Sequence, residues 1–462
     1  MKSKYYLTLA AIGVFAYAAQ ADISNIYGGL SDTDAAEINA TAGNLDVVLN
    51  PNQTDVSAKA FFKGNGNTIS SLKTSGAPAG WNIAGGETTI DINQAGTGSF
   101  DAFINGGTME WASGTAFDFV NSAGASAIAN VDVGTLSLAN SASSTHGLNF
   151  KTNANVLGTS FTASGNSYVV PAISVSNNSN VDYRVSESKF NGSSLISVEN
   201  GSTLNVYGTI ASDNRGIRFK VDGTFNYENT SSINLNASTI TGTFSAKSIT
   251  FIAGTSKLSG EGVINAAGSV YVGSRLTISD NAKVKLTKGT GGRQSQIVIE
   301  KSGKLTISAK DAIKYQGGLA NILMNGSRND AELTISADNM FDKLIFSRES
   351  NNEFLTLTVN NDARIYFNAI SFLYQTTTAT LKINNFTEES IFFKDISGWD
   401  DLDSVLLSDT EGNTYTKDDL SWVAGTYDGI GGYWLSTVPE PSAYAAIFGV
   451  CSIAFVIYRR RK

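Results

Sequence analysis

The sequence predicts an all-β protein that folds as a right-handed parallel β-helix, or solenoid, with an N-terminal signal peptide and a C-terminal hydrophobic helix. Three observations favour the solenoid. Short segments of alternating apolar and polar residues recur along the chain, which is the pattern of strands with one buried face. Small polar turns recur at intervals of roughly 21 to 32 residues, the length of one solenoid coil, except for a wider gap between Gly223 and Ala282 that Gly254 subdivides. No helical pattern of comparable strength interrupts the series.

Residues 1–21 have the pattern of a signal peptide. Its parts are a positive n-region with Lys2 and Lys4, an apolar h-region at 5–18, and an A-x-A cleavage site with Ala19 and Ala21. The mature chain is therefore expected to begin at Asp22, outside the cytoplasm.

Residues 22–180 are rich in Ala, Ser, Gly and Asn and carry few charges. Apolar pairs recur within this segment, for example at 109–111, 117–119 and 136–138. Low charge combined with regular apolar pairs is more typical of ordered coils than of a disordered linker. We therefore expect looser solenoid coils here, and a low-complexity spacer is the alternative.

Residues 181–397 carry the clearest repeats. The copies are 196–198 with 204–206, 219–221 with 225–227, 276–278 with 284–286, 297–299 with 305–307, 357–359 with 365–367, and the partial copy 333–335. One copy is too short to bury its own core, so it must stack on its neighbours. We expect Val198, Val221, Ile278, Ile299 and Val359 to stack in one apolar ladder. An antiparallel β-sandwich array is the alternative, and the lack of two-residue Asn-Gly hairpin loops disfavours it.

Residues 398–437 differ from the repeats because acids and tryptophans gather there. They are Asp400, Asp401, Asp403, Asp409, Asp418 and Asp419 with Trp399, Trp422 and Trp434. A solenoid exposes strand edges at its ends, and those edges need covering. This segment is therefore expected to form a C-terminal cap.

Residues 438–462 have three parts. They are the motif Val438, Pro439, Glu440, Pro441 and Ser442, a mostly apolar run at 443–458, and the basic stop Arg459, Arg460, Arg461 and Lys462. As a helix, the run would span roughly 24 Å, short of a ~30 Å hydrocarbon core. Starting the helix at Pro441 lengthens it a little, so 441–458 is a marginal transmembrane segment. The four cations should stay cytoplasmic.

This tail resembles the PEP-CTERM sorting tail of Gram-negative bacteria. The resemblance covers residues 438–462 and implies an exosortase-type sorting enzyme as a partner. It also implies export through the inner membrane and delivery to the cell surface, the outer membrane or the extracellular matrix. The membrane would be contacted through 441–458 before processing, or permanently if the tail is an ordinary single-pass anchor.

Composition narrows the classes of partner. The chain has 33 basic and 41 acidic residues, and the part between the two signals keeps 27 and 40 of them, a net charge of −13. An acidic body argues against nucleic acid as a partner. The lone cysteine, Cys451, lies in the apolar tail, so the body has no disulfide. No motif for a metal or a cofactor occurs, and none is expected.

Catalytic motifs are also missing from the sequence. The single histidine, His146, has no nearby acid or cysteine pattern, and no nucleophile elbow, zinc helix or P-loop occurs. The glycine cluster at 289–292 precedes Arg293 without the Lys-Ser or Lys-Thr of a P-loop, so it is read as a corner of the solenoid. We therefore expect no enzymatic activity.

Two other functions remain as alternatives. A β-helix polysaccharide hydrolase would need paired carboxylates, which Asp400–Asp401 and Asp418–Asp419 could supply, and a lyase could use Arg215 and Arg218 near Asp213. An ice-binding or other surface-binding solenoid would need regular hydroxyl ladders. Thr356, Thr358 and residues 376–378 hint at such ladders but do not recur in every coil.

The favoured interpretation is a secreted, non-enzymatic protein with a structural or adhesive role. The strand–turn–strand repeats are generically similar to the β-helix passenger regions of autotransporter-type adhesins. The sorting tail takes the place of a membrane barrel. Extracellular polysaccharide is the candidate partner of the solenoid.

Overall fold

The computed structural model describes residues 147–438 except 166–170, 193, 214, 289–293, 326–330, 348–352, 361 and 374–377, and it describes short strand segments between residues 22 and 139. The expected signal peptide with Ala19 and Ala21, His146, and the tail from Pro439 to Lys462 lie outside these residues. Val438 is the last described residue. Within the described residues, no helix is long and apolar enough to span a membrane.

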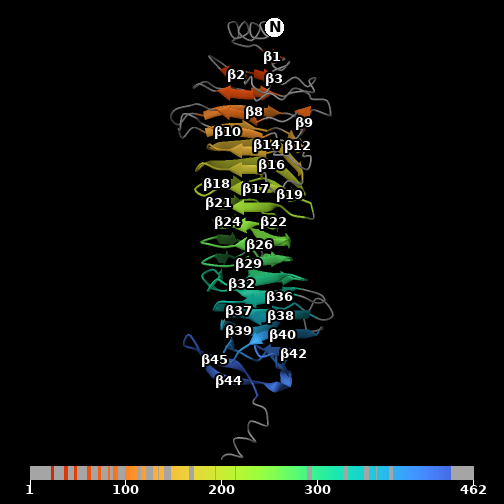
Figure 1. Cartoon of the computed structure of the whole chain (residues 1–462), viewed down its shortest axis with the longest axis vertical. Helices are drawn as coiled ribbons and strands as arrows, with labels where there is room; N and C mark the ends of the chain where they lie inside the picture. Colours follow the sequence, from red (N-terminus) through yellow and green to blue (C-terminus); the bar gives the residue numbers. More distant parts are fainter. Residues whose placement is uncertain are drawn as a thin grey trace, which may run out of the picture. The chain divides into compact units, whose positions relative to one another are not determined.

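The chain is all-β and forms parallel β-solenoid coils, as the repeats predict (Figure 1). Contacts divide it into two units. Unit 1 comprises Met1–Val298 and Ala312–Gly318, and unit 2 comprises Ile299–Asp311 and Leu319–Lys462. The described residues contain one helical segment, the 3-10 turn η1 (Lys417–Asp419).

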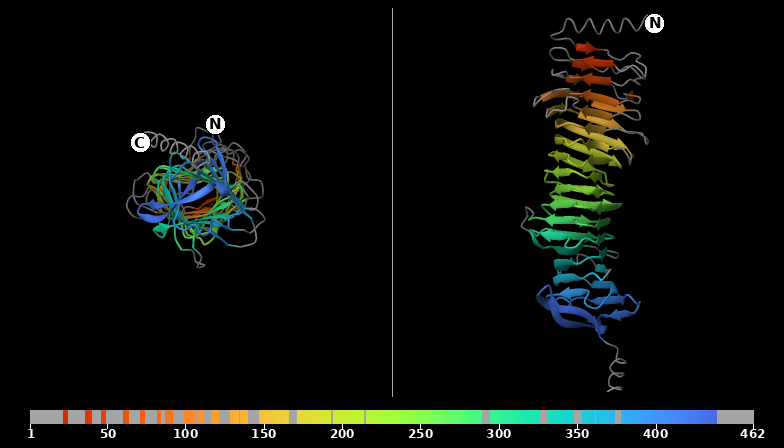
Figure 2. Two further views of the ribbon diagram at one scale, coloured as in Figure 1. Left: turned by 90° about the horizontal axis from the view of Figure 1, so that it is seen from below. Right: turned by 60° about the vertical axis from the view of Figure 1, so that its left-hand side comes forward.

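Unit 1 contains three sheets whose strands stack in parallel, and Figure 2 shows this stacking from a second direction. Sheet 1 consists of β2 (Ala36–Asn39), β4 (Ala60–Lys63), β7 (Glu87–Asp91), β10 (Ala116–Val120), β13 (Gly147–Phe150), β15 (Pro171–Val175), β17 (Leu195–Val198), β20 (Arg218–Val221), β23 (Thr239–Ile240), β26 (Thr255–Leu258) and β29 (Arg275–Ile278).

Sheet 2 lies next along each coil. Its strands are β1 (Asp22–Ser24), β3 (Asp46–Val48), β5 (Ser71–Lys73), β6 (Asn82–Ile83), β8 (Ser99–Asn105), β9 (Gly107–Trp111), β11 (Ile128–Asp132), β12 (Thr135–Ala139), β14 (Ala154–Gly165), β16 (Asn180–Gly192), β18 (Thr203–Val206), β19 (Thr209–Ser212), β21 (Thr224–Tyr227), β24 (Thr243–Ala246), β27 (Val263–Ala266), β30 (Lys283–Leu286) and β33 (Ile313–Tyr315). Sheet 3 of this unit consists of β22 (Ser232–Asn236), β25 (Ser248–Ala253) and β28 (Val270–Val272).

The long strand β16 gives way to two shorter strands in the next coil. Its first half pairs with β18 and its second half with β19. Gly208 lies between these two strands, and a Cβ there would overlap the carbonyl oxygen of Val185 in the coil before. The chain can turn at this point because glycine lets the two backbones approach closely.

The core of unit 1 is built from columns of apolar residues in register. In sheet 1, Val198 pairs with Val221, and the column continues through Ile240 and Leu258 to Ile278. All of these side chains are buried. Sheet 2 supplies a facing column of Leu204, Phe225, Phe244, Ile264 and Val284. Burying each of these side chains stabilises the coil by about 1.5–3 kcal/mol before conformational entropy is counted.

Aromatic rings join sheet 1 to the facing column of sheet 2, through Phe219, which stacks on Ile196 beside the Val198 column. The Phe219 ring lies 5.0 Å from that of Phe225 and 5.2 Å from that of Phe244, both edge-on, while Phe225 and Phe244 stack at 4.8 Å. These edge-to-face and stacked arrangements are the ones that aromatic quadrupoles favour. The rings therefore bridge sheet 1 and sheet 2 through the interior of two successive coils, because Phe219 and Phe225 belong to the same coil.

Unit 2 is also a stack of mostly parallel strands, in two sheets that end in antiparallel strands. Sheet 4 consists of β32 (Lys304–Ile307), β36 (Ala331–Ile335), β38 (Glu353–Val359), β40 (Ala379–Phe386), β42 (Ser404–Asp409) and β43 (Thr414–Thr416). Sheet 5 consists of β35 (Asn321–Asn325), β37 (Asn339–Phe346), β39 (Ile365–Phe372), β41 (Ile391–Phe393), β45 (Ile430–Thr437) and β44 (Leu420–Tyr427). Strands β31 (Gln296–Glu300) and β34 (Gly318–Leu319) each contain residues of both units.

The expected single ladder is wrong for Ile299. In unit 2, Val359 stacks on Ile335 and Ile307 in sheet 4. Ile299 lies instead in β31, which shares a sheet with β35 and β37. The copy at 297–299 and 305–307 is therefore shifted by one strand along the coil relative to the earlier copies. A tight turn suits more than one corner of a coil, so the motif alone does not identify the corner.

The segment expected to form a cap, 398–437, contains the antiparallel strand pairs of unit 2. Strand β43 folds back on β42, and β44 and β45 form a hairpin whose turn residues, Asp428 and Gly429, have φ of 46° and 80°. Positive φ at both positions is the requirement of the type I′ turn that hairpins favour. Strand β45 pairs antiparallel with β41. This pairing covers the strand edge that β41 would otherwise expose.

Candidate functional site

A row of polar side chains runs along the outer face of sheet 2. Period-two alternation buries Leu204 and Val206 and leaves Asn205 facing outward, and the same holds in the following coils. The residues in register are Asp182, Asn205, Asn226, Ser245, Asn265, Lys285 and Lys314. Over these coils the row passes from an acid through amides and a hydroxyl to two cations, and Asn155 precedes Asp182 in the same register.

Hydrogen bonds join neighbours in this row. The Asn205 side chain donates to Asp182 Oδ1 at 2.9 Å, and Asn226 donates to Asn205 Oδ1 at 2.8 Å. Further along, Asn265 donates to the Ser245 hydroxyl at 3.3 Å. These bonds hold the amides at the spacing of the strands, about 4.8 Å. The outer face therefore presents a fixed array of donors and acceptors.

A second row lies beside the first, two residues earlier in each strand. It consists of Thr203, Thr224 and Thr243, followed by Val263 and Lys283. All of these side chains are half-buried. The sequence analysis considered Thr-x-Thr pairs and did not identify this Thr-x-Asn pattern. In the second triplet of a repeat, such as 204–206, the polar residue between the two apolar positions already indicated this pattern.

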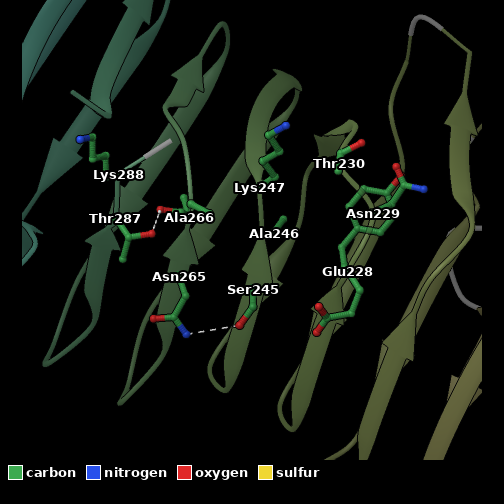
Figure 3. Close-up of a pocket in the computed structure, with 12 residues that line it drawn as sticks. Glu228, Asn229, Thr230, Ser245, Ala246, Lys247, Asn265, Ala266, Thr287 and Lys288 are labelled. Carbon is green, nitrogen blue, oxygen red and sulfur yellow. Dashed lines mark hydrogen bonds between the residues drawn. The ribbon is translucent and has the colours of Figure 1, made fainter. Parts of the chain in front are cut away.

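A groove with a volume of about 360 Å³ opens where sheet 2 ends, at the corners that follow β21, β24, β27 and β30 (Figure 3). Its floor is formed by small side chains of two coils, which are Ser245, Ala246, Asn265, Ala266 and Ala267. Residues 228–230 form one wall and residues 287–288 the other. The groove exists because the connections after β24 and β27, residues 247 and 267–269, are shorter than those after β21 and β30, residues 228–231 and 287–295.

Hydrogen bonds hold both walls in place. The Asn229 side chain donates to the carbonyl oxygen of Tyr207 at 3.3 Å and accepts from the Ser231 backbone at 2.9 Å. On the other wall, the Ser295 hydroxyl donates to the carbonyl oxygen of Thr287 at 2.5 Å, and the Thr287 hydroxyl reaches that of Ala266 at 3.5 Å. The groove is thus formed by the fold itself.

The charges of the groove are unequal. Figure 3 shows the ammonium groups of Lys247 and Lys288 at the same edge, with the Asn265–Ser245 hydrogen bond at the other. Glu228 supplies the one carboxylate among the lining residues. Lys247 and Lys288 have no ion pair within the part of the chain that the structure describes. This edge of an otherwise acidic protein is therefore locally positive.

The acidic pairs considered for catalysis lie in the segment expected to form a cap, 398–437. Local hydrogen bonds engage the Asp419 carboxylate and the Asp400 carbonyl oxygen. Asp419 Oδ2 accepts hydrogen bonds from the backbone and the hydroxyl of Thr416, both at 2.8 Å, in a capping box at η1. These bonds lower the pKa of Asp419. Lys417 donates to the carbonyl oxygens of Asp400 at 3.0 Å and Leu402 at 2.7 Å, which ties the two acidic segments together through the backbone.

The basic residues considered for a lyase lie in a short turn of unit 1. Asp213 Oδ1 accepts the backbone N–H of Arg215 at 3.0 Å, which is an Asx turn. Arg218 begins β20 in sheet 1. The Asp213 carboxylate therefore shapes the loop that precedes β20.

Two of the threonines considered for a surface lattice, Thr356 and Thr358, lie on the outer face of sheet 4, whereas residues 376 and 377 lie outside the described residues. Thr306, Thr334 and Thr358 are in register, and Asn384 follows them. Thr356 belongs to the adjacent row, where its register neighbours are Glu332 and Lys382. In that same row Lys304 lies 2.6 Å from Glu332. One threonine column therefore runs beside a charged column.

Comparison with protein-family models, with curated proteins and with solved structures finds no match for this chain. Within the described residues, His, Cys, Asp and Glu side chains nowhere gather in a group of three or more that could hold a metal ion.

Proposed function

We propose that this protein is a secreted, non-enzymatic β-solenoid with a structural or adhesive role at the cell surface or in the extracellular matrix. The observation that carries the proposal is the outer face of sheet 2, where polar side chains repeat coil after coil in register. Such a face makes many equivalent weak contacts, and linked contacts of this kind give avidity without a single deep pocket. Extracellular polysaccharide is the partner that this surface suits.

The sequence supports the delivery route. The signal peptide and the resemblance of residues 438–462 to a PEP-CTERM tail imply export followed by recognition by an exosortase-type enzyme. Strand β45 ends at Thr437, directly before Val438 and the Pro-Glu-Pro motif. The folded part would therefore be complete before the sorting signal begins.

We also propose that the coils wind with a right hand, the hand taken by nearly all crossovers between parallel strands.

The tail provides the test of this proposal. Mass spectrometry of protein extracted from the cell surface should find a carboxy terminus within residues 438–442, and deletion of 438–462 should release the protein from surface and matrix fractions. A terminus at Lys462 would show that the tail is a permanent anchor. Retention of the deleted chain in the matrix would show that sorting does not depend on the tail.

A further inference from the structure

We propose that the groove at the end of sheet 2 binds an anionic polysaccharide, a chain of carboxylated sugars that lies along the direction in which the coils of unit 1 stack. This inference rests on the proposed adhesive function and names the ligand class of one site. The groove is lined by residues of four successive coils, so a ligand following it crosses several coils instead of entering one.

The charge of the groove favours an anion. The body carries a net charge of −13, yet Lys247 and Lys288 lie at one edge of the groove and the exposed Lys285 follows Asn265 in the adjoining row. Against these three cations stands Glu228. A concave site lined mainly by one sign of charge raises the local concentration of the opposite ion.

The spacing of the lysines favours a polymer. Lys247 follows β24, and Lys288 lies just beyond the end of β30, two strands further along sheet 2. At about 4.8 Å between neighbouring strands, the two positions are about 10 Å apart along the stack. That separation is comparable with the length of a disaccharide unit in an extended glycan, so alternate sugars would place their carboxylates near successive lysines.

The uncharged lining favours sugars over other polyanions. Asn265, Ser245 and Thr230 offer amide and hydroxyl groups, and sugar hydroxyls both donate and accept hydrogen bonds. Single-stranded nucleic acid would need aromatic rings for base stacking. The one aromatic residue of the lining, Tyr227, is buried, and its hydroxyl accepts the backbone N–H of Ile210 at 3.2 Å.

An acidic peptide fits the groove less well. Extended peptides commonly bind by adding a strand to a free sheet edge. Strand β24, which runs beneath the groove, is paired on one side with β21 and on the other with β27. No strand position is therefore open at the floor.

Binding of the purified full chain to polygalacturonate and to its methyl ester tests the proposal, because the two probes differ in the carboxylate alone. We expect binding to the acid form that weakens with salt, and little binding to the ester. Lys247→Gln and Lys288→Gln should each lower the affinity about two- to fivefold. Glu228→Gln should raise the affinity. The control is Lys257→Gln, an exposed lysine on sheet 1 that should leave binding unchanged.

Several results would overturn the proposal. Equal binding of the ester, no binding of the acid form, or insensitivity to both lysine substitutions would remove the groove as an anion site. Lysine-dependent binding of single-stranded DNA or polyglutamate in preference to polygalacturonate would assign the groove to a different polymer. None of these results bears on surface retention, which the tail experiment measures separately. Far-ultraviolet circular dichroism of each variant verifies that the coils remain folded.

Discussion

Asn226 donates a hydrogen bond to the side-chain oxygen of Asn205 at 2.8 Å, although the two residues are 21 positions apart in the sequence. The parallel register of β18 and β21 places them side by side. Each such bond connects one coil to the next on the solvent side, while the apolar columns connect the coils inside. The outer row therefore contributes to stability as well as presenting a surface.

Replacing Asn226 with alanine should destabilise unit 1 modestly. The change removes the side chain that donates to Asn205, and a hydrogen bond of this kind contributes about 0.5–1.5 kcal/mol. Urea unfolding followed by circular dichroism measures the loss. Thr230→Ala, at an exposed wall position of the groove, is the control and should change the unfolding free energy by less than about 0.5 kcal/mol. Equal effects of the two changes would show that the row does not stabilise the coils.

A charge in the apolar column should be far more damaging than the same charge beside it. Val221 is buried and its neighbour Lys220 in β20 is exposed. Val221→Asp removes apolar contacts and buries an unpaired carboxylate, at a cost of several kcal/mol. Lys220→Asp changes charge on the outer face and removes an exposed ion pair with Asp222 at 3.8 Å, which is worth less than about 1 kcal/mol, so it should have a small effect. Thermal unfolding compares the two variants.

The damage from Val221→Asp should also be local at first. Coils of a solenoid contact their neighbours, so loss of one coil weakens the adjacent ones before distant ones. Hydrogen exchange should therefore show faster exchange in β17 and β23, which pair with β20, before β13. Uniform acceleration along unit 1 would show that the unit unfolds as a single cooperative block.

The solenoid fold was predictable because its signal is local. Alternation at 204–206 and 225–227 identifies buried strands, and the spacing of the copies identifies stacking. The identity of the corner was not predictable, as Ile299 shows, because a turn such as Ser302-Gly303 suits more than one corner. The hairpin fold-back at Asp428 also depends on contacts distant in the sequence, including the packing of Trp434 on Phe392 at 4.9 Å.

The groove was not predictable because it arises from differences between coils. Lys247 and Lys288 are 41 positions apart in the sequence, and both face the groove because the intervening corner is short. The acidic pairs were candidates for catalysis because glycosidases use paired carboxyl groups. The structure shows a different role for Asp419, which caps η1 through Thr416. A capping acid and a catalytic acid look alike in a single sequence.

Alkaline pH should loosen the hairpin of β44 and β45. Burial, and then the nearby carboxylates of Asp338, Asp428 and Asp311, raise the pKa of Tyr427 from 10.0 to about 12. Because the folded state holds the phenol protonated, its contribution to stability is complete below the unfolded pKa of about 10. That contribution is lost as the pH rises through the folded value of about 12.

Thermal unfolding at about pH 9 and about pH 11 measures this effect. Tyr427→Phe should reduce the loss of stability between the two values, because the variant has no phenol to ionise. Tyr433→Phe changes an exposed tyrosine of the same hairpin and should retain the wild-type pH dependence. If Tyr427→Phe and the wild type lose the same stability at high pH, Tyr427 is not the group that titrates.

The full chain should leave polysaccharides uncut. A glycosidase needs one carboxyl group that stays protonated beside a second carboxylate. Among the acidic pairs, Asp419 has its pKa lowered by hydrogen bonds from Thr416, the opposite of what a general acid requires. Assays of polygalacturonate, alginate, xylan and sulfated algal glycans, with calcium present, should show no new reducing ends and no unsaturated products. Turnover that disappears on Asp→Asn substitution at Asp400, Asp401, Asp418 or Asp419 would instead make the cap an active site and the protein an enzyme.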